Sequence, residues 1–268
     1  MRRYIRILAI ILLFTMLFLS ACNEPVYHAA GKPQGDDVAV MGSVDDAPVS
    51  GKKRVAITYD DGPHNVYTKK IVDELSKYGF HATFFVIGNR VDGTAYNGVA
   101  GITYAYEKGK EIAIHGYTHE AYYNKCDDDT YKYEIESTEA AIKNVLEGVE
   151  IKLMRPIGGA ITSARVESSE YAVILWDVDS EDWNYKYREN SDYTDEEKAE
   201  KIDTIVNNVM DNVQDGSIIL MHDIYVSTYD ATVIILERLY NEGYEVVTVS
   251  ELLGSELSAG KKFSRKSE

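Results

Sequence analysis

The chain has 268 residues and a formal net charge of −16 at pH 7, and 45% of its residues are hydrophobic. Its length suffices for one large domain with a single core. So strong a negative charge repels nucleic acids and other polyanions, which excludes a nucleic-acid partner and favours a neutral or weakly charged one. The sequence predicts no protein partner.

The first 21 residues are predicted to be a secretory signal peptide. Three arginines precede an apolar run of about 13 residues, which is shorter than the roughly 20 that a membrane-spanning helix needs. The small residues before Cys22 resemble a bacterial lipobox, which predicts cleavage before a lipidated Cys22. An ordinary cleavage site followed by a chance cysteine is the alternative. We expect the mature protein at the extracellular face of a bacterial cell membrane, lipid-anchored or else secreted.

A lipidated cysteine and a flexible linker are predicted over residues 22–53, which are rich in Gly, Pro, Ser and Asp and lack periodicity. Cys22 and Cys126 are the only cysteines. If Cys22 is lipidated, no intramolecular disulfide can form, so the fold must be held together by its core. We assign Cys126 no role.

Short apolar runs alternate with helical stretches over residues 54–254, which we expect to form one domain. Helices are clearest at residues 129–146 and 198–213, where apolar residues recur with helical spacing. Residues 255–268 are predicted to be a frayed polar tail. The predicted strands are residues 55–59, 82–87, 111–114, 151–154, 172–178, 217–221 and 245–249.

This alternation predicts an α/β fold with parallel strands joined by right-handed crossovers. Seven such units around one core favour a closed or nearly closed barrel over an open sheet. No glycine-rich phosphate loop follows the first strand, which argues against a nucleotide-binding sheet.

Five polar residues directly follow predicted strands. Asp60 and Asp61 follow the first strand, His115 and His119 the third, and His222 the sixth. In a βα barrel the carboxyl ends of the strands converge on one face, which is where active sites lie. We therefore expect these side chains to form one site.

The carboxylates of Asp60 and Asp61 are adjacent, and such a pair needs a cation or an arginine to neutralise it, which suggests one metal ligand beside one base. On the dipeptide alone a solvated turn is the favoured interpretation, since Gly and Pro follow. His115 and His119 are four residues apart, a spacing that puts both on one side of a helical turn and suits a divalent metal. Two histidines and one aspartate would leave coordination positions open, as in catalytic sites.

Three further candidates lie near strand ends. Arg155 closes the fourth strand, where it could neutralise a carboxylate. Asp182 and Trp183 follow the fifth, and Trp183 is as suited to the core as to a site. Trp176 falls inside a predicted strand and is expected in the core.

These residues fall in five ordered motifs, at residues 58–63, 115–119, 154–156, 179–183 and 219–222. Together they resemble the polysaccharide deacetylases of carbohydrate esterase family four, the NodB homology domain. The resemblance implies a deformed (β/α)7 barrel as a single catalytic domain, in agreement with the seven predicted strands. It also implies metal-dependent hydrolysis of N-acetyl groups from an acetylated polysaccharide. The substrate it suggests is N-acetylglucosamine of peptidoglycan or a chitin-like oligomer.

Carried over residue by residue, the resemblance assigns Asp61, His115 and His119 as ligands of a divalent metal. The metal is usually zinc, with cobalt or another divalent ion as alternatives. The resemblance also assigns Asp60 as the general base and Arg155 as the residue that orients it.

The resemblance further implies that His222 is the general acid, with its pKa tuned by Asp182. Leu220 and Trp183 would form the pocket for the acetyl methyl group. The third motif departs from the family pattern, because Gly158 stands where an aromatic residue is usual. The backbone N–H of Gly158 could still serve an oxyanion, but the groove loses an aromatic wall.

Other functions remain open from the sequence. The same site could attack an O-acetyl ester, as in a xylan-type esterase. The altered third motif also suits a glycan-binding protein with little turnover. A mononuclear iron oxygenase uses two histidines and a carboxylate too, but such sites are typical of β jelly rolls, and this sequence alternates strand with helix.

Overall fold

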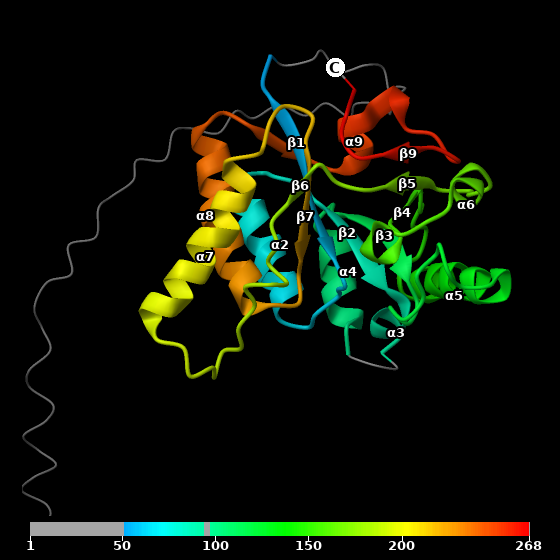
Figure 1. Ribbon diagram of the computed structural model, residues 1–268, viewed down its shortest axis with the longest axis horizontal. Coiled ribbons are helices and arrows are strands. Elements are labelled where there is room, and N and C mark those ends of the chain that lie inside the picture. The colour runs from blue at the N-terminus through cyan, green and yellow to red at the C-terminus, as the bar shows by residue number, and fades with distance from the viewer. Residues whose placement is uncertain (1–50, 94–96, 268) are drawn as a thin grey trace, which may run out of the picture. The chain divides into compact units, whose positions relative to one another are not determined.

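A curled parallel β-sheet forms the centre of the fold, with most helices on its outer side (Figure 1). The computed structural model describes residues 51–93 and 97–267. The predicted signal peptide, Cys22 and nearly all of the predicted linker lie outside the described residues. No described helix has the length and hydropathy that a membrane span requires.

The ladders of the sheet are parallel, in the order β6-β7-β1-β2-β3-β4-β5-β9, with β8 also paired to β1. This is the βα barrel that the alternation of strands and helices predicts, in the deformed form that the family resemblance implies. The strands are β1 (Arg54–Asp60), β2 (Thr83–Ile87), β3 (Glu111–Gly116), β4 (Leu153–Met154), β5 (Ala172–Ile174), β6 (Val178–Asp179), β7 (Ile218–His222), β8 (Glu245–Val247) and β9 (Lys262–Phe263).

The single strand predicted at residues 172–178 is in fact two strands, because the chain changes neighbours between them. The amide of Leu175 donates to the carbonyl of Phe263 beyond β5, whereas the amide of Asp177 donates to Ile218 on β7. Three residues span at most about 10 Å. The two ends of the sheet must therefore curl toward each other, and residues 175–177 close the barrel that the ladders leave open.

Capping decides where the helices begin. Thr194 and Glu197 form a capping box at the start of α7, so this helix begins three residues before the predicted residue 198. Asp127 caps α5 by accepting from the amide of Thr130. The helices are α2 (Tyr67–Lys77), α3 (Gly88–Val91), α4 (Val99–Glu107), α5 (Asp128–Val145), α6 (Ser163–Glu167), α7 (Asp195–Met210), α8 (Val226–Asn241) and α9 (Val249–Leu253), with 3₁₀ turns at Ile157–Gly159 and Gly254–Glu256.

The alternation of side chains along β1 separates two cores. Val55, Ile57 and Tyr59 belong to the large cluster that also includes the buried faces of the outer helices. Ala56 belongs to a smaller cluster with residues of α9. Toward the carboxyl end of the same strand face, polar Asp60 follows. The interior of the barrel is thus apolar toward the amino ends of the strands and polar toward their carboxyl ends. The site lies at the polar end.

The tail predicted to be frayed is instead ordered through residue 267 and adds β9 to the edge of the sheet. Phe263 packs against the smaller core cluster, a contact that the polar composition of the tail does not reveal.

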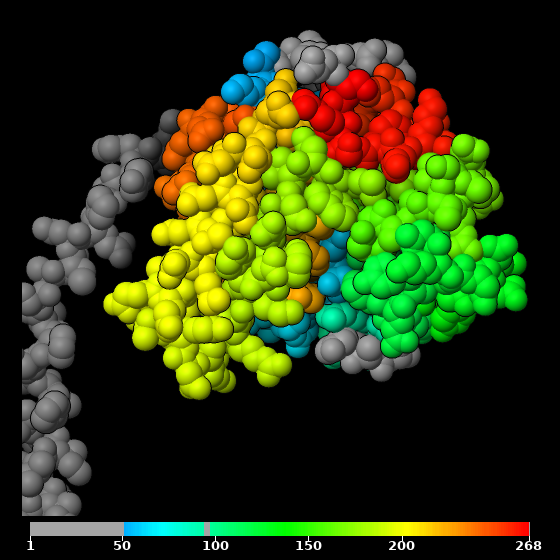
Figure 2. Space-filling model, viewed as in Figure 1, coloured from blue at the N-terminus to red at the C-terminus, as the bar shows by residue number. Residues whose placement is uncertain are grey.

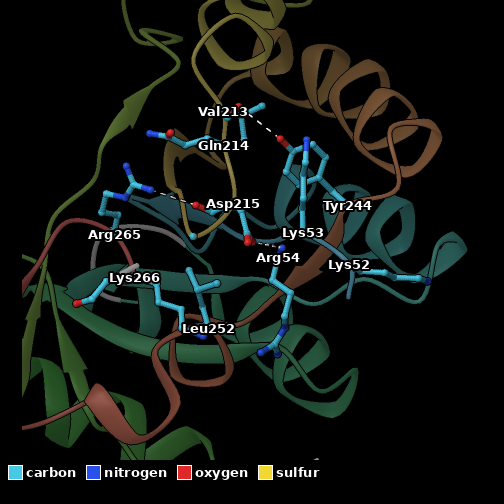
Figure 3. Close-up of a pocket in the computed structure, with 12 residues that line it drawn as sticks. Lys52, Lys53, Arg54, Val213, Gln214, Asp215, Tyr244, Leu252, Arg265 and Lys266 are labelled. Carbon is cyan, nitrogen blue, oxygen red and sulfur yellow. Dashed lines mark hydrogen bonds between the residues drawn. The ribbon is translucent and has the colours of Figure 1, made fainter. Parts of the chain in front are cut away.

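Figure 3 shows a pocket beside this tail, where Asp215 accepts hydrogen bonds from Arg265 and from Arg54 at the start of β1. The guanidinium of Arg265 donates to the carbonyl of Asp215 at 3.2 Å, and the Arg54 amide donates to Asp215 Oδ1 at 2.7 Å.

Candidate active site

A cavity of about 570 Å³ lies at the carboxyl ends of the strands. Figure 2 shows this face hollowed between the surfaces coloured green and lime, with blue and orange atoms deeper inside. Arg155 and Asp182, two of the predicted catalytic residues, are fully buried and do not line it. The other predicted catalytic, metal and substrate-binding residues do: Asp60, Asp61, His115, His119, Gly158, Trp183, Leu220 and His222.

Asp61, His115 and His119 present ligand atoms that all lie within 4.8 Å of one another. Asp61 Oδ1 is 3.5 Å from His115 Nε2 and 3.0 Å from His119 Nε2. This buried oxygen has no hydrogen-bond partner among the described residues. Burial raises the pKa of Asp61, but the two neighbouring imidazoles outweigh it and hold that pKa well below its usual value. A buried carboxylate oxygen that faces two imidazole nitrogens fits a divalent cation.

The tautomer of His115 also suits a metal ligand. Its Nδ1 lies 2.9 Å from the carbonyl oxygen of Arg155, to which an Nδ1–H donates. The lone pair of Nε2 is then free to face Asp61. The two histidines do not share a helical turn as predicted, because His115 belongs to β3 and His119 follows in a loop with a left-handed φ of 66°.

The loop between the two histidines is fastened by Glu134, a residue that the sequence analysis did not single out. Glu134 lies on α5 and is only 2% exposed. Its Oε2 accepts from the amides of Tyr117 at 2.6 Å and Thr118 at 2.9 Å, and its Oε1 accepts from the Thr118 hydroxyl. An acidic residue on the buried face of a predicted helix was the available signal, since such a carboxylate needs polar partners.

The two adjacent carboxylates have different partners. Asp60 Oδ1 accepts from Arg155 Nη1 at 2.7 Å, and both side chains are almost completely buried. Its other oxygen, Oδ2, lies 3.6 Å from His115 Nε2. Asp61 instead faces both imidazoles. One carboxylate is therefore paired with an arginine, whereas the other lies against two candidate metal ligands.

His222 and Asp182 form a second charged pair on the same cavity. His222 Nδ1 is 2.7 Å from Asp182 Oδ1, while Asp182 Oδ2 accepts from the His222 amide and from the Thr228 hydroxyl at 2.6 Å. Burial lowers the pKa of His222, but the charge and hydrogen bond of Asp182 outweigh it and raise that pKa to about 9. This raised pKa favours the protonated imidazole, which is the form that can donate a proton.

Apolar side chains complete the cavity wall. Leu220 is nearly buried on β7, whereas Trp183 is 46% exposed in the loop after β6. Trp176, predicted for the core, does pack against the smaller core cluster, but it is only partly buried and also lines the cavity, with its ring 5.6 Å from the Arg155 guanidinium. It does so because it lies in the crossing segment 175–177 and not inside a strand. Gly158 sits in a 3₁₀ turn with a φ of 58°.

A family model described as polysaccharide deacetylase matches residues 47–172. The chain is 34% identical over 201 residues to the peptidoglycan-N-acetylmuramic acid deacetylase PdaC of Bacillus subtilis, which covers 75% of this chain but 39% of that protein. It is 32% identical over 212 residues to a peptidoglycan-N-acetylglucosamine deacetylase of Bacillus cereus, covering 76% of this chain and 90% of that protein.

Among solved structures, the fold matches a family 4 acetyl xylan esterase from Clostridium thermocellum in complex with a cobalt ion. The TM-score is 0.66 at 28% identity, with 80% of this chain and 98% of the other covered. The chain belongs to the polysaccharide deacetylase family, carbohydrate esterase family four. It spans about two fifths of the length of the Bacillus subtilis relative.

Replacing Glu134 with alanine is expected to weaken the affinity for Zn²⁺ about 10- to 100-fold, because the loop between the two histidines loses the acceptor of two amides. Competition with a chromophoric chelator measures this affinity. Glu136→Ala is the matched control, since Glu136 lies on the same helix with its side chain exposed. Equal affinities for the two variants would show that Glu134 does not position the histidines.

Asp182→Asn is expected to lower the pKa of His222 from about 9 toward the ordinary 6.5 or below, because the largest contribution that raises it is lost. The raised pKa keeps the imidazole charged below about pH 9, so the variant loses the charge at lower pH. An NMR titration of the His222 ring protons follows this shift. Asp211→Asn, at the exposed end of α7, is the control. A pKa still near 9 in Asp182→Asn would be contrary to this assignment.

Proposed function

We propose that the protein is a divalent-metal-dependent hydrolase that removes N-acetyl groups from a cell-envelope glycan. The substrate we propose is N-acetylglucosamine or N-acetylmuramic acid of peptidoglycan, as the names of the two Bacillus relatives suggest. The observation that carries the proposal is one cavity lined by the triad Asp61, His115 and His119, with Asp60 and His222 beside it.

Asp61, His115 and His119 are proposed to hold the metal, which when bound would polarise the acetyl carbonyl and activate a water molecule. Two nitrogen donors and one carboxylate oxygen suit zinc, and cobalt accepts the same set. We propose zinc as the native ion.

The protein residues would carry the proton transfers. Asp60, held by its ion pair with Arg155, would take a proton from the attacking water, whose oxygen forms a bond to the acetyl carbon. His222 would give its proton to the amide nitrogen as the C–N bond breaks, which releases acetate and the amine of the sugar. The backbone N–H of Gly158, at the cavity wall, would donate to the developing oxyanion.

The methyl end of the acetyl group also needs an apolar binding pocket. Leu220 and Trp183 line the cavity with His222 and are proposed to contact the acetyl methyl. Their apolar surface favours a methyl group over a charged substituent at that point.

We further propose that the protein is attached to the outer face of the cell membrane by a lipid on Cys22, with residues 23–53 as a tether. The lipobox-like sequence before Cys22 supports this proposal. An anchor there would place the domain beside the cell-wall glycan. Cys22→Ala should move the protein from the membrane fraction to the medium, and retention in the membrane fraction would refute the anchor.

The metal-loaded protein is expected to release acetate from peptidoglycan or from N-acetylglucosamine oligomers. Removal of the metal by a chelator should abolish acetate release, and added Zn²⁺ or Co²⁺ should restore it. The reason is that the three ligand residues cannot activate a water molecule without the metal. An enzymatic acetate assay measures the rates.

Acetylated xylan is the comparison substrate, since one structural relative is an acetyl xylan esterase. Release from acetylated xylan only would make the protein an O-acetyl esterase. Glycan binding without release from any substrate would make it a binding protein. Either result would overturn the proposed reaction.

A further inference from the structure

Tyr122 fills the space that a side chain on residue 158 would otherwise occupy. A Cβ placed at Gly158 would lie 3.2 Å from Tyr122 Cε1, which is closer than ordinary van der Waals contact. Both residues line the cavity that holds the catalytic candidates. Residue 158 has no side chain to form this part of the cavity wall. The loop that follows His119 forms it instead, through the ring of Tyr122.

Packing in the core does not explain where Tyr122 lies. Its side chain is 51% exposed, whereas the next residue, Tyr123, is completely buried. An aromatic ring at the mouth of a polar cavity offers a large apolar surface with a hydroxyl at its edge, which is the surface that a bound ligand can use.

The loop that carries Tyr122 is held in place by the protein itself. The carbonyl of Tyr122 accepts from the amides of Lys125 at 3.0 Å and Cys126 at 3.1 Å. Arg165 donates to the carbonyls of Tyr123 and Cys126, each at 3.0 Å. A binding surface fixed in this way loses little conformational entropy when a ligand arrives.

Tyr122 and Trp183 approach the cavity from different loops. Tyr122 lies three residues after His119 in the loop beyond β3, and Trp183 directly follows Asp182 beyond β6. Both are about half exposed and both line the cavity. The Lys125 ammonium lies 5.7 Å from the centroid of the Tyr122 ring, over one of its faces.

We infer that Tyr122 is a substrate-binding residue that stacks on the C–H face of a sugar ring and replaces the wall missing at Gly158. The inference rests on the proposed glycan substrate. Because Tyr122 contacts the sugar and not the acetyl group, it acts on glycan affinity and leaves the chemical step unchanged.

Tyr122→Ala tests this role in the Zn²⁺-loaded full chain. The KM for an N-acetylglucosamine oligomer should rise roughly 3- to 10-fold, the range that loss of one aromatic contact supports, with kcat within about twofold of the wild type. Hydrolysis of 4-nitrophenyl acetate, which has no sugar ring, should be unchanged. Tyr122→Phe should keep the wild-type KM, because it keeps the ring.

Tyr240→Ala is the matched control, since Tyr240 is 56% exposed on α8 and does not line the cavity. Equal KM values for Tyr122→Ala and this control would overturn the inference, as would a parallel loss on both substrates. If the wild type released acetate from neither substrate, the proposed function would fail instead. The calorimetric Kd of the oligomer for the same proteins would then decide on Tyr122 alone, with a 3- to 10-fold weaker Kd expected.

Discussion

Arg155 is completely buried, and a buried charge destabilises a fold unless it is paired and fully hydrogen-bonded. Here its guanidinium donates to Asp60 and Thr58 on β1 and to the carbonyls of Ile174 and Leu175 at the end of β5. Its own carbonyl accepts from His115. The side chain thus joins opposite parts of the curled sheet and pairs with one carboxylate, while the backbone carbonyl of the same residue sets the tautomer of His115, a proposed metal ligand.

Backbone strain gathers around the same cavity. Asp61, His119 and Glu181 are the described non-glycine residues with a left-handed φ, between 54° and 70°. Each belongs to a loop that directly follows a strand. Such conformations persist only where neighbouring groups stabilise them. Glu134 accepts a hydrogen bond from the loop that contains His119, and Asp182, in the loop that contains Glu181, accepts one from the His222 amide. The geometry of the site therefore depends on residues that do not touch the cavity.

Most of the fold and the central site were predictable because they follow from local patterns. Alternating apolar runs placed the strands of the barrel, and polar residues at their ends brought Asp60, His115 and His222 to one face. What could not be predicted depends on tertiary contacts. The strand predicted at residues 172–178 is divided near Trp176 because the chain changes its strand partner there. Phe263 pairs with β5, although the polar composition of the surrounding tail gives no sign of a strand. The Tyr122 ring lies where a side chain on residue 158 would be, and these two loops are far apart in sequence.

The central claim is that two adjacent carboxylates have separate duties, since Arg155 neutralises Asp60 and leaves Asp61 for the metal. The most direct test is the zinc content of dialysed Asp60→Asn and Asp61→Asn, measured by atomic emission together with acetate release. Asp60→Asn should retain one zinc per chain yet lose at least about 100-fold in rate, the usual loss for a general base. Asp61→Asn should lose both zinc and activity. Loss of zinc from Asp60→Asn, or its retention by Asp61→Asn, would contradict this division of roles.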